Sequence, residues 1–161
     1  MRLCHFVALA LAASLATPAS ADLLSHRDLS LDTALAMATV AQETCKGQGY
    51  RVSVTVVGRE GQVILQMRGD NASPHTMENS LRKAYTARTF RVPSGDIGKR
   101  LKENPTLSFP FLTNVTGAQG ALPIKLGEEV IGAMGVSGAP GGEKDEACVK
   151  AGLDKVADQL K

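Results

Sequence analysis

Histidine side chains are the groups in this chain best suited to acid–base or metal chemistry near neutral pH. The 161 residues contain three of them, His5, His26 and His75. His5 lies in an apolar N-terminal segment, and neither His26 nor His75 has a partner at metal-ligand spacing. His75 comes at the start of a predicted helix, beside a loop rich in Gly and Asn. We therefore predict that His75 is accessible and can bind a metal, with a surface histidine of no specific role as the alternative.

Positive charge gathers around His75 in the sequence. Arg68 ends the segment before the loop, and the helix after the loop carries further groups that could hold an anion: Arg82, Lys83, Tyr85 and Arg88. Such side chains bind carboxylates and phosphates through charge-assisted hydrogen bonds. A solvated helix face is the alternative interpretation of the same residues.

A second candidate is the glycine-rich segment GAPGG at residues 138–142, which leads directly into the last predicted helix. Its backbone N–H groups are suited to bind a carboxylate or phosphate, although a tight strand-to-helix turn has the same composition. Ser137 precedes this segment, but the chain has no GxSxG motif and no identified histidine–carboxylate pair for that serine. The motifs favour a binding protein over an enzyme.

Helices and hairpins must position these residues. Apolar spacing and capping signals predict helices at residues 31–46, 74–90, 94–102 and 143–160. Alternating β-branched segments predict two hairpins, 51–57 with 62–68 and 121–126 with 129–136, and a short strand at 114–117. Hairpin-linked strands form a mainly antiparallel sheet that apolar helix faces must cover. The predicted class is α+β in two or three layers.

The N-terminus has the pattern of a secretory signal peptide. Arg2 precedes an apolar run at residues 6–16, and Ala19 and Ala21 are small residues at the −3 and −1 positions of a cleavage site. A membrane anchor is excluded because the run is shorter than the roughly 20 residues that a span needs. We expect cleavage of residues 1–21, a single domain at residues 22–161, and a periplasmic or secreted location.

Composition limits the partners and the redox state. A formal net charge of +2 and 4% aromatic residues give no indication of nucleic-acid or membrane-surface binding. Two cysteines, Cys45 and Cys148, follow the signal peptide. In an oxidising compartment they form either a disulfide or a pair of buried thiols.

Five segments together resemble the GlcG/HbpS family of haem-binding and haem-degrading-type domains. They are residues 52–57 (VSVTVV), 68–72 (RGDNA), 83–87 (KAYTA), 122–124 (LPI) and 130–138 (VIGAMGVSG), the last followed by Asp145 and Glu146. The resemblance spans about residues 29–160. It implies a five-stranded antiparallel sheet flanked by helices in a profilin-like layered architecture, and assembly into homo-oligomers. It also implies that the first and last helices lie close together, which favours a Cys45–Cys148 disulfide.

The signal peptide and the resemblance together predict an exported haem-binding or haem-sensing accessory protein. Of the two histidines after the signal peptide, His75 is the better placed, so we predict it as the axial iron ligand, with Tyr85 in reserve. The nearby cations for the haem propionates are Arg68, Arg82 and Lys83. Three alternatives stay open. They are a corrinoid or similar small ligand, a non-haem oligomeric partner of a periplasmic enzyme or sensor, and a small-molecule enzyme that uses Ser137 with residues 138–142.

Overall fold

The computed structural model describes residues 22–161, so the predicted signal peptide at residues 1–21 lies outside the described residues. The helices are α1 (Leu31–Gly47), α2 (His75–Phe90), α3 (Ser94–Glu103) and α4 (Gly142–Lys155), with short 3-10 helices η1 (Phe109–Phe111) and η2 (Ala157–Leu160). The strands are β1 (Ser53–Val57), β2 (Val63–Arg68), β3 (Ala121–Leu126) and β4 (Glu129–Ser137). The last predicted helix is therefore shorter than expected, since its final turn is η2.

One antiparallel sheet joins the strands in the order β2-β1-β4-β3, which confirms the predicted α+β class. The prediction of five strands is wrong, because the described residues form a sheet of four. The predicted strand at residues 114–117 is irregular, and Asn114 has a left-handed φ of 65°. The N–H of Thr116 donates to Thr86 Oγ1 of α2 at 2.9 Å, so this segment bonds to a helix instead of to a strand.

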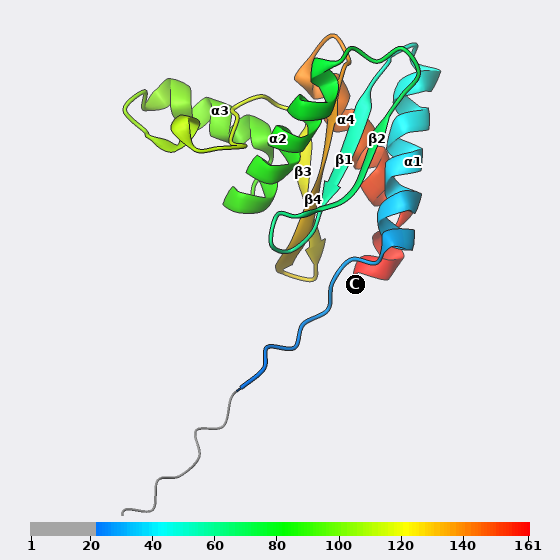
Figure 1. The fold of residues 1–161 in the computed structure, drawn as a ribbon, viewed down its shortest axis with the longest axis vertical. Helices are drawn as coiled ribbons and strands as arrows, with labels where there is room; N and C mark the ends of the chain where they lie inside the picture. The colour runs from blue at the N-terminus through cyan, green and yellow to red at the C-terminus, as the bar shows by residue number, and fades with distance from the viewer. Residues whose placement is uncertain (1–21) are drawn as a thin grey trace, which may run out of the picture.

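Helices cover both faces of the sheet. Figure 1 shows α2 on one side of the strands and α1 with α4 on the other, while α3 and the segment after it extend beyond α2. Successive side chains of β1 point to opposite faces of the sheet, as the pleat of a strand requires. Val54 and Val56 join the main apolar core with α1 and α4, and Thr55 faces α2, where its Oγ1 lies 2.7 Å from Ser80 Oγ.

Small residues bring α2 very close to the sheet. A Cβ atom built on Gly135 of β4 would lie 2.4 Å from the Ser80 carbonyl oxygen and 2.8 Å from the Ala84 backbone nitrogen. Ala84, Ala87 and the facing alanines of β3 and β4 form a second, smaller apolar cluster. The α2 backbone therefore packs directly on β4, and this contact fixes the position of the first turn of α2.

A disulfide between Cys45 and Cys148 joins α1 to α4, with the two Cα atoms 5.7 Å apart. Both cysteines are fully buried in the main core. The structure thus contains the bridge that the resemblance favoured. Separately, none of the helices within residues 22–161 combines the length and apolar character that a membrane span requires.

Candidate functional site

A pocket of about 330 Å³ lies where the start of α2, the end of β4 and the start of α4 meet. We call it the α2–α4 pocket. Its lining includes residues 118–119, the loop at 138–142 and the side chains of Ser73, His75, Thr76, Asn79, Lys83, Ser137 and Asp145. It therefore unites His75 with the glycine-rich segment, two features that are about 60 residues apart in the sequence.

Two helix N-termini face this pocket without side-chain caps. The N-cap residues of α2 and α4 are Pro74 and Gly141, and neither has a side chain that bonds the first turn. Ser73 precedes Pro74 but does not cap α2 with its side chain, and its carbonyl oxygen accepts from the N–H and Oγ1 of Thr76. The first N–H groups of a helix carry partial positive charge. Both helix starts thus favour an anionic group in the pocket.

A buried ion pair forms the floor of the pocket. Lys83 Nζ donates to Asp145 Oδ2 at 2.7 Å and to the Val136 carbonyl oxygen at 3.0 Å, and both charged side chains are about 4% exposed. Asp145 Oδ1 accepts the N–H of Ala139 at 2.9 Å. Burial raises the pKa of the Asp145 carboxyl, and the hydrogen bond from Lys83 opposes this rise. Lys83 therefore fixes the 138–142 loop and is not a free cation for a ligand.

Asn79 is a wall residue that sequence reasoning missed. Its Nδ2 donates to Ser137 Oγ at 2.9 Å. Among the described residues, no histidine or carboxylate forms a hydrogen bond with Ser137, so the usual activating base is not seen beside this hydroxyl there. The spacing of His75, Asn79 and Lys83, four residues apart on one helix face, was the signal that could have grouped them.

The other predicted ligand-binding residues do not join His75. Arg82 donates from Nη2 to the Val115 carbonyl oxygen at 2.9 Å, and its Nη1 lies 3.8 Å from Glu78 Oε1. Tyr85 lines a separate small pocket beside Gly61, and its position in the helix is about 15 Å from that of His75. Of the five predicted residues, His75 and Lys83 line the α2–α4 pocket together, while Arg68 and Tyr85 line other pockets.

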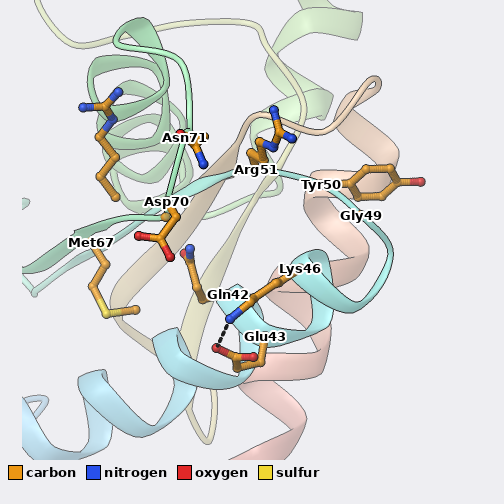
Figure 2. Close-up of a pocket in the computed structure, with 11 residues that line it drawn as sticks. Gln42, Glu43, Lys46, Gly49, Tyr50, Arg51, Met67, Asp70 and Asn71 are labelled. Carbon is orange, nitrogen blue, oxygen red and sulfur yellow. Dashed lines mark ion pairs between the residues drawn. The ribbon is translucent and has the colours of Figure 1, made fainter.

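Arg68 lines a larger pocket of about 540 Å³ between the end of α1 and the end of β2. Figure 2 shows the Glu43–Lys46 ion pair on one side of this pocket, with Met67 and Asp70 across from it. The walls carry charges of both signs, and Arg68 itself donates from Nε to the Ala72 carbonyl oxygen at 2.9 Å. The loop after β2 lines both this pocket and the α2–α4 pocket, so the two pockets are neighbours.

The α2–α4 pocket has donor groups that fit a haem. The exposed imidazole of His75 suits the iron, and the uncapped helix starts suit the propionate carboxylates. The pocket walls are mainly polar, so this pocket alone does not supply the apolar surface that the porphyrin faces need. Within residues 22–161, no cluster of three or more His, Cys, Asp or Glu side chains could hold a bare metal ion.

The fold and the pocket define a small α+β domain with a mainly polar pocket between the starts of α2 and α4. Residues 29–154 match the family model described as "Haem degrading protein HbpS-like", and the chain belongs to this HbpS-like family. A curated relative, an uncharacterized 15.0 kDa protein from the dhaT–dhaS intergenic region of Citrobacter freundii, is 32% identical over 129 residues. That match covers 78% of this chain and 90% of the relative.

Solved structures agree with this assignment. A double mutant of HbpS from Streptomyces reticuli is 32% identical with a TM-score of 0.79, covering 86% of this chain and 96% of that one. The Klebsiella pneumoniae protein ORFY is 26% identical with a TM-score of 0.78, covering 86% and 97% of the two chains. The PduOC:Heme complex, at 19% identity and a TM-score of 0.71 over 79% and 94%, shares the fold.

Proposed function

We propose that this chain is an exported haem-binding or haem-sensing accessory protein that holds haem at the α2–α4 pocket. The observation that carries the proposal is the exposed imidazole of His75 at the mouth of a pocket that two uncapped helix N-termini face. Membership of the HbpS-like family supports the ligand class, as does the shared fold of the PduOC:Heme complex.

Each part of the pocket has a role in this proposal. His75 binds the iron through a ring nitrogen, and the first N–H groups of α2 and α4 bind propionate oxygens. Lys83 and Asp145 hold the 138–142 loop in position, because their buried ion pair ties α2 to the start of α4. Haem, when bound, would supply an iron centre that the imidazole of His75 could coordinate.

A second copy of the chain completes the apolar environment in this proposal. The segment after α3 exposes Phe111 and Leu112, which are 90% and 55% accessible in the single chain. Exposed apolar groups that lie together are typical of protein contact surfaces. They also favour the alternative function, a non-haem oligomeric partner of a periplasmic enzyme or sensor.

Titration of the purified protein with haemin, followed by absorbance, tests the ligand class. The proposal predicts a saturable shift of the Soret band at a fixed ratio of haemin to chain. A parallel titration with a corrinoid such as cobinamide separates the two tetrapyrrole classes. The absence of a saturable change with haemin would contradict the proposal and favour the interaction-partner function.

Export is tested independently by the intact mass of protein recovered from outside the cytoplasm. The small residues before Asp22 predict a mature chain that begins there. A mass that still includes residues 1–21 would rule out this cleavage, whatever the outcome of the haemin titration.

A further inference from the structure

A pocket of about 270 Å³ lies at the opposite end of α2 from His75, about 20 Å away along the helix. We call it the arginine pocket. Three parts of the fold supply its lining: the β1–β2 turn, the last turn and C-cap of α2, and the β3–β4 hairpin. The charged residues are Arg59, Arg88, Arg91, Lys125, Glu128 and Glu129.

The arginine pocket has four cations and only two carboxylates in its lining, so its net charge is positive. Glu129 pairs with Arg59, whose side chain is only 10% exposed and also donates from Nη2 to the Arg27 carbonyl oxygen at 2.6 Å. Glu128 is exposed to solvent and forms no ion pair within the described part of the chain. Among residues 22–161, Arg88, Arg91 and Lys125 have no carboxylate at ion-pair distance, so the pocket has three unpaired cations.

Arg88 is a pocket cation that lacks a hydrogen-bond acceptor for its Nε–H group within the described part of the chain. It is half-buried, and its Nε is inaccessible to solvent without any hydrogen-bond partner in the described residues. Arg59 Nε is in the same condition. Burial lowers the pKa of Arg88, and the nearby charge of Arg91 lowers it further. An Nε–H group that has lost water and gained no acceptor is costly for a folded chain.

The helix dipole does not explain this arrangement. The partial negative charge at the C-terminus of a helix favours a nearby cation, and Arg88 lies in the last turn of α2. This partial charge does not account for a second guanidinium beside the first, with Lys125 approaching from β3. Glu60, in the neighbouring small pocket that Arg88 also lines, forms no ion pair with it. The unpaired cations that line the pocket therefore lack, within residues 22–161, the counter-charge that an external anion can supply.

We propose that the arginine pocket binds a phosphate group of a small ligand, independently of the haem site. The planar fork of a guanidinium binds two phosphate oxygens at once, and tetrahedral oxygens accept from donors that converge from different directions. Arg88 and Arg91 approach from α2 and Lys125 approaches from β3. A flat monoanionic carboxylate satisfies fewer of these donors, so the pocket selects phosphate.

Nitrogen-15 NMR of the arginine Nε–H groups tests the proposal on the purified protein without haemin. Sodium phosphate is titrated in at constant ionic strength, and sodium acetate and sodium chloride serve as parallel titrations. We expect the Nε–H signals of Arg59 and Arg88 to move saturably with phosphate, with acetate binding more weakly. Shifts that stay linear, or that chloride or acetate reproduces equally, would overturn the proposal.

Substitutions assign the response to the pocket. Arg88→Gln and Arg91→Gln should each weaken phosphate binding about tenfold or more, the loss expected for a charged hydrogen bond. Arg100→Gln, on the exposed face of α3, is the matched control and should leave phosphate binding unchanged. Arg91 is exposed, so its substitution tests the site even where Arg88→Gln impairs folding. Wild-type affinity in Arg91→Gln would contradict the assignment.

Discussion

At the scale of single residues, the Lys83–Asp145 pair determines whether the α2–α4 pocket keeps its shape. Lys83→Met leaves a buried carboxylate without its cation and removes the link between α2 and the 138–142 loop. Breaking a buried pair in this way costs about 3–5 kcal/mol. We expect a loss of this size in the free energy of unfolding at neutral pH, measured with urea.

The pH dependence of this loss identifies its cause. Burial raises the pKa of Asp145 in the folded protein, and removal of Lys83 raises it further. The penalty is therefore full at neutral pH and shrinks as the pH falls through the raised pKa, because a protonated carboxyl needs no cation. Lys150→Met breaks an exposed pair with Asp154 and should cost about 0.5 kcal/mol. Equal losses in the two variants would contradict a special role for Lys83.

The sequence predicted which side chains lie near His75 more reliably than what those side chains bind. Lys83 was expected to hold a ligand carboxylate, and it lies in the pocket with His75. Its actual partner, Asp145, is 62 residues further along the chain. Helical spacing places side chains on one face of a helix, but it carries no information about which carboxylate approaches that face from another element.

At the scale of elements, the close contact of α2 with β4 depends on Gly135. Gly135→Ala introduces a methyl group where the α2 backbone lies within 3 Å, so the helix must move. Overpacking of this kind typically costs about 1–3 kcal/mol. We expect that loss in urea unfolding, with weaker binding of any ligand that depends on the first turn of α2.

Gly47→Ala is the matched control for Gly135→Ala. Gly47 ends α1, and no neighbouring atom lies within 4 Å of the place that an alanine methyl group would occupy there. An alanine at this position should therefore be neutral or slightly stabilising. An unfolding midpoint of Gly135→Ala equal to that of Gly47→Ala would show that α2 does not rest on β4 as described.

The disulfide connects elements from the two ends of the domain. It closes a loop of 103 residues between α1 and α4. In the chain-entropy model such a loop is worth about 4–5 kcal/mol, although strain often reduces the gain. We expect the Cys45→Ala, Cys148→Ala double variant to unfold at lower urea concentration than the oxidised protein. An unchanged unfolding midpoint would contradict a stabilising bridge.

Local sequence patterns predicted most of the helices and strands. The errors occur where contacts between distant parts of the chain determine the local structure. The two hairpins and all four helices form close to their expected positions, because alternation and capping are local signals. The strand expected at 114–117 does not form, since Thr86 of α2 takes the N–H of Thr116. The last helix ends early at Lys155, and η2 continues the chain.

At the scale of the whole molecule, α2 separates two sites of different chemistry. Its first turn presents His75 to the α2–α4 pocket, and its last turn presents Arg88 to the arginine pocket. The imidazole of His75 and the uncapped helix starts suit a metal porphyrin with carboxylates, whereas the unpaired guanidinium groups suit phosphate. The two sites can therefore be tested one at a time.

The central claim is that His75 binds the iron of haem, and comparison of histidine variants in the haemin titration tests it most directly. His75→Ala should weaken binding or displace the Soret band, while His26→Ala, in the exposed segment before α1, should match the wild type. Because His75 is itself exposed, its substitution should leave the urea unfolding midpoint unchanged. A Soret band and affinity in His75→Ala identical to those of the wild type would contradict the claim.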